Sequence, residues 1–192
     1  MNIYDPYPDS IKHNGKIIRL NLAYDRVLMV LDAQNDQTLL PLDRLELQVT
    51  LLLADGEKVP KSSREQADLL RDIFTLFPQD DAPVKQNERY IDFHQDAAMI
   101  RSAFFRIGID LLREKIHFLR FLELLKDLPP DTALMKTIEI RMRPVPKPDG
   151  HNAEQIAAIM KAKAAVAIRM SEDERRRHFA EALKNSSLLT GR

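Results

Sequence analysis

Apolar residues recur every three to four positions along most of this chain, the spacing that places them on one face of an α-helix. The pattern predicts helices over residues 22–31 and 62–77, and a third that begins at Pro41, because proline is tolerated where a helix starts. Residues 45–53 also alternate between apolar and polar side chains. A strand therefore stays an open alternative for that segment.

Two local features refine these elements. Ser62 and Glu65 have the spacing of a capping box, in which each side chain bonds a backbone amide of the first helical turn. Residues 16–20 favour a short extended segment. No second segment is predicted to pair with it, since residues 1–15 contain two prolines and a glycine and are expected to be irregular.

Residues 90–143 predict three consecutive helices with short connections. Asp92 is expected to accept hydrogen bonds from the first-turn amides, with Gln95 as its reciprocal partner, and Gly108 supplies a left-handed stop. Asp110 is expected to restart the chain as a second helix, which continues to residue 125. The run Pro129-Pro130-Asp131-Thr132 then ends that helix and opens the third, through residues 138–141.

Three alternating prolines in residues 144–150 favour an extended linker. The sequence thus predicts an all-α protein with a helical core domain (1–143), a proline-rich linker (144–150) and a C-terminal helical arm (151–192). The arm is expected to hold an alanine-rich helix over 153–170 and a second helix over 172–184. The alanine-rich helix could fold back on its own domain or lie in a groove of a partner.

Composition narrows the function classes. Lys+Arg and Asp+Glu both number 29, so no net field draws the chain to nucleic acid or membrane. There is no cysteine, which excludes disulfides and thiolate metal sites and suits a reducing cytosol. No apolar run approaches the roughly 20 residues that span a bilayer. A basic run at 175–177 is offset by neighbouring acids, which argues against a nucleic-acid-binding regulator.

Candidate chemistry is sparse. Asp92 and Asp96 lie four residues apart and could mimic a catalytic pair, but their place in a first turn favours capping. Arg141 could cap its own helix or pair with one of these acids. The five histidines lack metal-ligand spacing, and His117 is expected to pack at a helix interface with one nitrogen satisfied. We therefore expect no enzyme activity, no metal and no cofactor.

Residues 90–143 also carry a resemblance. They contain the order DF-x-x-DA-x-x-I-x-x-x-F, GIDL, a histidine-aromatic-x-x-F-x-x-LL segment, LP-x-DT and I-x-I-R, which resembles the bacteriophage gene-product-fifteen family of tailed phages and prophages. Ile107 stands where that family usually has tyrosine, and Phe118 where it usually has tryptophan. Both replacements keep a large apolar side chain. Residues 20–53 show a looser similarity.

The resemblance implies a phage tail morphogenesis protein, in particular a tail assembly chaperone that binds the tape-measure protein in the host bacterial cytoplasm before the tail tube polymerises. A minor structural tail or connector protein retained in the virion is the alternative. Implied partners are the tape-measure protein, other tail proteins and further copies of the chain in a homo-oligomer, without nucleic acid or membrane. The candidate protein-interaction residues are Ile156, Ile159, Val166, Met170, Phe105 and Phe118.

Overall fold

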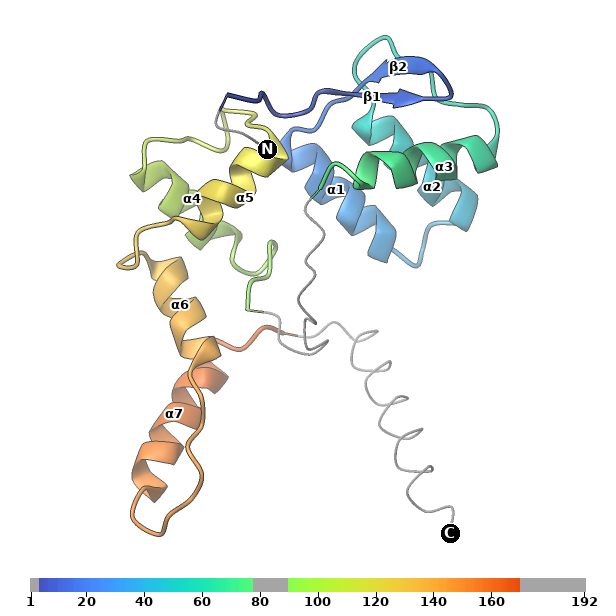
Figure 1. The fold of residues 1–192 in the computed structure, drawn as a ribbon. Helices are drawn as coiled ribbons and strands as arrows, with labels where there is room; N and C mark the ends of the chain where they lie inside the picture. The colour runs from blue at the N-terminus through green and yellow to red at the C-terminus, as the bar shows by residue number, and fades with distance from the viewer. Residues whose placement is uncertain (1–3, 78–89, 170–192) are drawn as a thin grey trace, which may run out of the picture. The chain divides into compact units, whose positions relative to one another are not determined.

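The computed structural model describes residues 4–77 and 90–169 (Figure 1). These residues form seven helices and one two-stranded sheet, which confirms the mainly helical fold and the short β element. Contacts group the chain into two units, Met1–Lys85 with Arg101–Pro129, and Gln86–Ile100 with Pro130–Arg192. Each unit is described by itself. Residues 130–142 are thus grouped with the proline-rich linker and the arm, and the independence of the arm stays a prediction.

The first unit begins with a β-hairpin. β1 (Ser10–His13) pairs antiparallel with β2 (Lys16–Arg19), and Asn14 and Gly15 form the turn with φ of 47° and 78°. Positive φ at both central residues is typical of the two-residue turns that suit strand twist. The extended segment at 16–19 is therefore confirmed. The expectation that residues 1–15 are irregular and offer no pairing strand was wrong, and Asn-Gly was the signal for the hairpin.

Three helices follow the hairpin and contribute part of the core of this unit (Figure 1). They are α1 (Tyr24–Asn35), α2 (Pro41–Leu52) and α3 (Ser63–Phe74). Pro41 is the first residue of α2, so the helical alternative holds for 45–52. The side chains that share the interior are fully or almost fully buried: Val27, Val30, Val49, Leu52, Leu69 and Ile73.

The predicted capping box at α3 was wrong. Ser62 is the N-cap residue, but its side chain makes no capping hydrogen bond. Ser62 and Glu65 are both exposed, so water can satisfy the first-turn amides. The side-chain amide of the buried Gln66 donates instead to the carbonyl of Pro60 at 2.7 Å, which fixes the loop before the helix.

A buried histidine attaches the hairpin to α3. His13 is 5% exposed, and its Nδ1 lies 2.7 Å from Oδ2 of Asp72. The side-chain amide of Asn14 donates to Nε2 at 3.1 Å, so the geometry requires the proton on Nδ1. Both ring nitrogens are therefore engaged in holding the hairpin in place.

Aromatic rings fill the space where α5 (Phe118–Lys126) meets α1 and the end of α4 (Ala97–Arg106). Phe121 stacks on Phe104 at 5.1 Å between centroids and on Tyr24 at 5.0 Å. Phe118 lies 6.3 Å from Phe121 and meets Phe77 edge-on at 5.4 Å. Offset and edge-on pairs of this kind contribute about 0.5–1.5 kcal/mol each beyond the apolar area that they bury.

Gly108, with φ of 87°, ends α4 as predicted, but the single helix expected over 110–125 was wrong. Residues 111–113 form a turn, residues 114–116 are irregular, and α5 begins only at Phe118. The break has a tertiary cause. The amide of Tyr24 donates to the carbonyl of Ile116 at 2.9 Å, and the amide of Phe118 donates to the carbonyl of Leu22 at 2.8 Å. These bonds make an extended bridge that a continuous helix could not form.

His117 is the N-cap of α5 and joins three segments of the first unit. Its Nδ1 accepts from the amide of Leu119 at 3.1 Å, and its Nε2 lies 3.0 Å from the carbonyl of Pro8. Tyr7 stacks on the ring at 5.0 Å. The predicted packing role is confirmed, with both nitrogens satisfied instead of one. The ring is neutral in this arrangement, because an acceptor Nδ1 carries no proton.

The second unit contains α6 (Ala133–Met142) and α7 (Ala153–Ala165), whose C-terminal ends meet, and residues 143–152 connect the two helices and run alongside α7 (Figure 1). Thr132 caps α6 by accepting from the amide of Met135 at 3.3 Å, as predicted. α7 is shorter than the expected 153–170. The second arm helix, expected over 172–184, lies outside the described residues. Among the helices that are described, none is long and apolar enough to cross a membrane.

We expect the stability of the first unit to depend on pH through His117. Burial lowers the pKa of His117 below its usual range, so the unfolded chain binds the proton first as pH falls. His117 should therefore cost no stability above about pH 6.5, where it is neutral in both states. The free energy of unfolding should decline as pH falls from there toward the lowered pKa. Urea unfolding at pH 7.5 and pH 5 measures the decline.

His117→Asn is the matched variant, because asparagine keeps an N-cap acceptor without a proton to bind. It should lose less stability on acidification than the natural chain. His117→Ala should lower the free energy of unfolding by about 1 kcal/mol at pH 7.5. An equal acid-induced loss in the natural chain and in His117→Asn would assign the pH dependence to other groups.

Candidate functional site

The second unit is organised by one buried ion pair. Asp96 is 0% exposed and Arg141 8% exposed, and their side chains meet in a two-pronged contact. Nη1 of Arg141 donates to Oδ2 of Asp96 at 2.6 Å, and Nη2 donates to Oδ1 at 2.9 Å. Bidentate pairs of this kind are the strongest charge-assisted hydrogen bonds in proteins. The alternative in which Arg141 pairs with one of the predicted acids is therefore confirmed.

Arg141 also binds two backbone segments. Nη1 donates to the carbonyl of Tyr90 at 2.8 Å, and Nε donates to the carbonyl of Val166 at 2.7 Å. Gln95 continues this contact, since its side-chain amide donates to the carbonyl of Ala167 at 3.0 Å and its oxygen accepts from the amide of Arg169 at 2.9 Å. We call Gln95, Asp96 and Arg141 with these backbone groups the Arg141 clamp.

The acids before α4 are structural. Asp92 Oδ1 accepts from the amides of His94 and Gln95, each at 2.8 Å, as predicted for a cap. The prediction that Gln95 is the reciprocal partner of Asp92 was wrong. Oδ2 of Asp96 accepts from the amide of Asp92 at 2.9 Å, and the side chain of Gln95 binds the backbone of Ala167 instead. Because Asp96 has no exposed surface, these two carboxylates cannot reach a substrate as an acid–base pair.

The basic side chains around one polar hollow of the first unit are also engaged in their own contacts. A cavity of about 340 Å³ in the first unit is lined by Asp9, Asp55, Lys115 and His117, among others. Nζ of Lys115 pairs with Oδ2 of Asp25 at 2.7 Å, and both nitrogens of His117 are engaged. No group of three histidine, aspartate or glutamate side chains within 4–77 and 90–169 has the geometry of a metal site. The basic run 175–177 lies outside those residues.

Mostly apolar side chains line two hollows along α6 and α7. Leu134, Thr137 and Arg141 face inward on α6, whereas Met135, Ile138 and Met142, displaced by one position, line a hollow of about 480 Å³. A second hollow of about 550 Å³ lies between α7 and the chain that leads to it. We call the residues that line the two hollows the α6–α7 surface: Met135, Ile138, Glu139, Met142, Arg143, Pro144, Pro146, Gln155, Ala158, Ile159 and Ala162.

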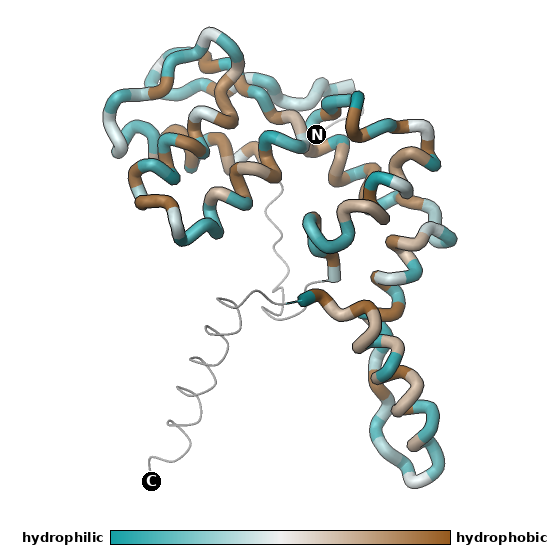
Figure 2. The backbone as a smooth tube through the Cα atoms, turned by 180° about the vertical axis from the view of Figure 1, so that it is seen from behind, coloured by the Kyte–Doolittle hydropathy of each residue, from teal (hydrophilic) through white to brown (hydrophobic). Residues whose placement is uncertain are grey.

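α7 contributes to this surface because it has no buried residue of its own. Met142, which lines one of the hollows, is 55% exposed, and Val145 and Met160 are exposed apolar residues of the same unit that line neither hollow. Apolar side chains alternate with hydrophilic ones along α6 and α7, and the turn between them is hydrophilic (Figure 2). Large apolar side chains gathered on one face of a unit mark interaction surfaces more often than isolated ones do.

The structure separates the predicted interaction residues. Ile156, Ile159 and Val166 are half-buried, and of these Ile159 lines a hollow while the carbonyl of Val166 belongs to the clamp. Phe105, in the first unit, is 70% exposed, whereas Phe118 is 8% exposed and part of the aromatic core. The core alternative thus holds for Phe118. Met170 lies outside the described residues.

The prediction missed several residues of the α6–α7 surface: Met135, Ile138, Met142, Ala158 and Ala162. A signal existed on α6. Its apolar residues occupy two neighbouring helical stripes, more than one buried face requires.

Comparison with known proteins gives one family. The model of the family described as Bacteriophage Gp15 protein matches residues 3–168. A search of curated proteins and a search of solved structures found no match. The residues of the Asp92, Asp96 and Arg141 cluster all lie inside the matched range.

Removing one partner of the buried ion pair should be costly. We expect Asp96→Asn or Arg141→Met to lower the free energy of unfolding by about 3–5 kcal/mol, because a buried charge is left without its counter-charge. The double variant should lose less than the sum of the single losses. Urea titrations followed by circular dichroism measure the free energy of unfolding of the natural chain, the two single variants and the double variant.

Glu139→Gln is the control, since the Glu139–Arg143 pair is exposed and joins Oε1 and Nη2 at 3.3 Å. Its loss should stay within about 0.5 kcal/mol. Additive losses in the double variant would show that the Asp96–Arg141 contact contributes no coupling.

Proposed function

The chain belongs to the bacteriophage Gp15 family, and on that premise we propose that it is a tail assembly chaperone. In this proposal it binds the tape-measure protein in the host cytoplasm and keeps its apolar helix faces covered until tail-tube subunits polymerise around them. The observation that carries the proposal is the α6–α7 surface, a mostly apolar surface in the unit that the Asp96–Arg141 ion pair holds together.

The surface supports reversible binding and not chemistry. Fully burying an exposed methionine or isoleucine side chain yields about 1.5–3 kcal/mol. Met135, Ile138 and Ile159 are already half-buried, so each yields only part of that amount, which suits weak and reversible binding. Methionine suits this role because its unbranched side chain adapts to differently shaped neighbours. A chaperone that meets many similar helix faces along one long partner needs that adaptability.

The described polar groups give no support to an enzyme. The buried acids are engaged in the Arg141 clamp and its cap, and the two most buried histidine side chains hold backbone or a carboxylate. We therefore propose a binding protein without a cofactor.

Co-expression with the tape-measure product of the same phage tests the proposal. The natural chain should raise the soluble fraction of that product and co-purify with it. Ala158→Arg places a long charged side chain in the hollow beside α7 and should abolish both effects. Arginine is a good helix former, so the helix itself should persist.

Ala157→Arg is the matched control, because Ala157 is exposed on α7 and does not line the hollow. It should behave as the natural chain does. If the natural chain neither solubilises the tape-measure product nor co-purifies with it, the chaperone proposal fails.

Mass spectrometry of purified particles distinguishes the alternative. A chaperone should be missing from mature particles, whereas a minor structural tail or connector protein should be present in a fixed ratio to the other tail proteins. Detection in a fixed ratio would replace the proposed function with the structural one.

A further inference from the structure

We propose that Asn14 is a site of spontaneous deamidation, and that the carboxylate formed there converts the buried ring of His13 from a neutral group into a charged one. The reactants are the side-chain amide of Asn14, the backbone nitrogen of Gly15 and water. These residues lie in the first unit, so the inference is independent of the function proposed for the α6–α7 surface.

Asn14 is followed by the residue type that makes this reaction fastest. In deamidation, the backbone nitrogen of the next residue attacks Cγ of asparagine, and glycine leaves that nitrogen uncrowded because it has no side chain. Of the seven asparagines in the chain, Asn14 alone precedes a glycine. Asn14 and Gly15 are both exposed, and a Cβ added to Gly15 would meet no atom of a non-adjacent residue within 4 Å.

The attacking nitrogen is also free to react. Within the described residues, the N–H of Gly15 donates to no backbone or side-chain acceptor, so no hydrogen bond must break before it loses its proton. Ring closure needs a rotation of the backbone at Asn14. Because both turn residues are exposed, this rotation displaces no core side chain.

The reaction replaces an amide by a carboxylate in two steps. The nitrogen of Gly15 loses its proton to a base in the solvent and forms a bond to Cγ of Asn14, while the bond from Cγ to Nδ2 breaks and Nδ2 leaves as ammonia with a proton from water. A second water then opens the cyclic imide at one of its two carbonyl carbons. The products are aspartate and isoaspartate, and no atom is oxidised or reduced.

Asn14 binds the ring of His13 through the very group that the reaction removes. Nδ1 of His13 carries the ring proton, because the carboxylate of Asp72, 2.7 Å away, can only accept. Nε2 therefore presents a lone pair, to which the side-chain amide of Asn14 donates at 3.1 Å. A carboxylate in place of that amide has no proton to donate, so it sets a negative charge against the lone pair.

Protonation of His13 removes this repulsion. An imidazolium donates from both nitrogens, to Asp72 on one side and to the new carboxylate on the other. Two opposite charges within hydrogen-bond distance favour the charged form of the ring, and water screens them little because His13 is only 5% exposed. The buried ring would then lie between two carboxylates.

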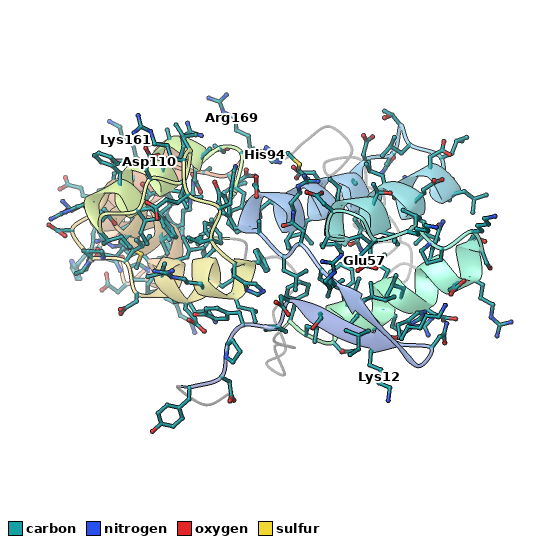
Figure 3. All side chains as sticks on the ribbon, turned by 90° about the horizontal axis from the view of Figure 1, so that it is seen from above. Lys12, Glu57, His94, Asp110, Lys161 and Arg169 are labelled. Carbon is teal, nitrogen blue, oxygen red and sulfur yellow. The ribbon has the colours of Figure 1, made fainter. Side chains whose placement is uncertain are left out.

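The other charged groups near this ring act more weakly. Lys12 precedes it on β1 and projects outward (Figure 3), and Lys16 lies opposite it on β2 with an exposed side chain. On α3, Asp68 lies one turn before Asp72 and pairs with Arg71 at 3.0 Å. Solvent screens these exposed charges, so the group that replaces the amide of Asn14 decides the state of the ring.

Peptide mass spectrometry of the full chain, incubated at pH 8 and 37 °C, tests the reaction. The peptide that contains Asn14 should gain the mass difference between an amide and an acid, at least tenfold faster than the peptides that contain Asn21, Asn35 and Asn152. Those three are followed by residues with a side chain and serve as internal controls. Conversion of Asn14 at the same rate as these asparagines would overturn the proposal.

Asn14→Asp tests the effect on His13. Aspartate tolerates the left-handed backbone of this position, so circular dichroism should match that of the natural chain. In nuclear magnetic resonance titrations, the ring of His13 should stay protonated to a higher pH in the variant than in the natural chain. Because the folded variant then binds this proton more tightly than its unfolded chain, its loss of stability relative to the natural chain should grow as pH rises above about 6.5.

Gln34→Glu is the matched control, because it adds the same charge at an exposed position of α1. It should leave the titration of His13 unchanged. The aspartate form of the aged natural chain, separated by ion exchange, should titrate as Asn14→Asp does, which repeats the comparison without a substitution. A ring that titrates alike in the natural chain and in both aspartate forms would overturn the proposal.

Discussion

The second unit depends on the ion pair between Asp96 and Arg141. α7 has no fully buried residue, so its hydrophobic contacts are limited to half-buried side chains such as Ile156 and Ile159. Its position is fixed at its end instead, where Nε of Arg141 binds the carbonyl of Val166 and Gln95 binds the next turn of chain. Asp96 makes this possible, because an arginine buried without a counter-charge would be too costly to hold there. The ion pair therefore helps to hold one end of α7, and the side chains that line the two hollows stay accessible to a partner.

In the first unit, a histidine side chain holds separate backbone segments together. Residues 115–118 leave the helical path in order to pair with the chain before α1, and the new helix that follows needs a cap. His117 supplies the acceptor for α5 while its other nitrogen holds Pro8, so one side chain ends the bridge, starts the helix and attaches the N-terminal segment. A serine or threonine could cap the helix equally well but could not span to a second backbone segment at the same time.

Features determined by neighbours in sequence could be predicted, and features determined by distant segments could not. Pro41, Gly108 and Thr132 act within one turn of the backbone, and each lies at the predicted helix end. The break at 110–117 depends on hydrogen bonds to residues more than 90 positions earlier, and no local pattern encodes it. The same holds for the site. Phe105 and Phe118 have the same side chain and both lie in predicted helices, and the contacts of Phe118 with Phe77 and Phe121 accompany its burial while Phe105 is exposed.

The acids and the arginine that make residues 90–143 resemble a phage family had looked like candidates for catalysis or binding, and their geometry gives them a different role. The side chains of Asp96 and Arg141 bind each other, and those of Asp92, Asp96 and Arg141 also bind backbone groups. Residues that a family shares for this reason identify a fold, and they point to function only through what the fold presents. Here the clamp holds α7 without covering it. The functional surface should therefore be sought mainly among residues that the motif does not contain, where methionine, isoleucine and alanine line the hollows of α6 and α7. Such a face can change its side chains while the clamp stays the same, so it can follow a changing partner without loss of the fold.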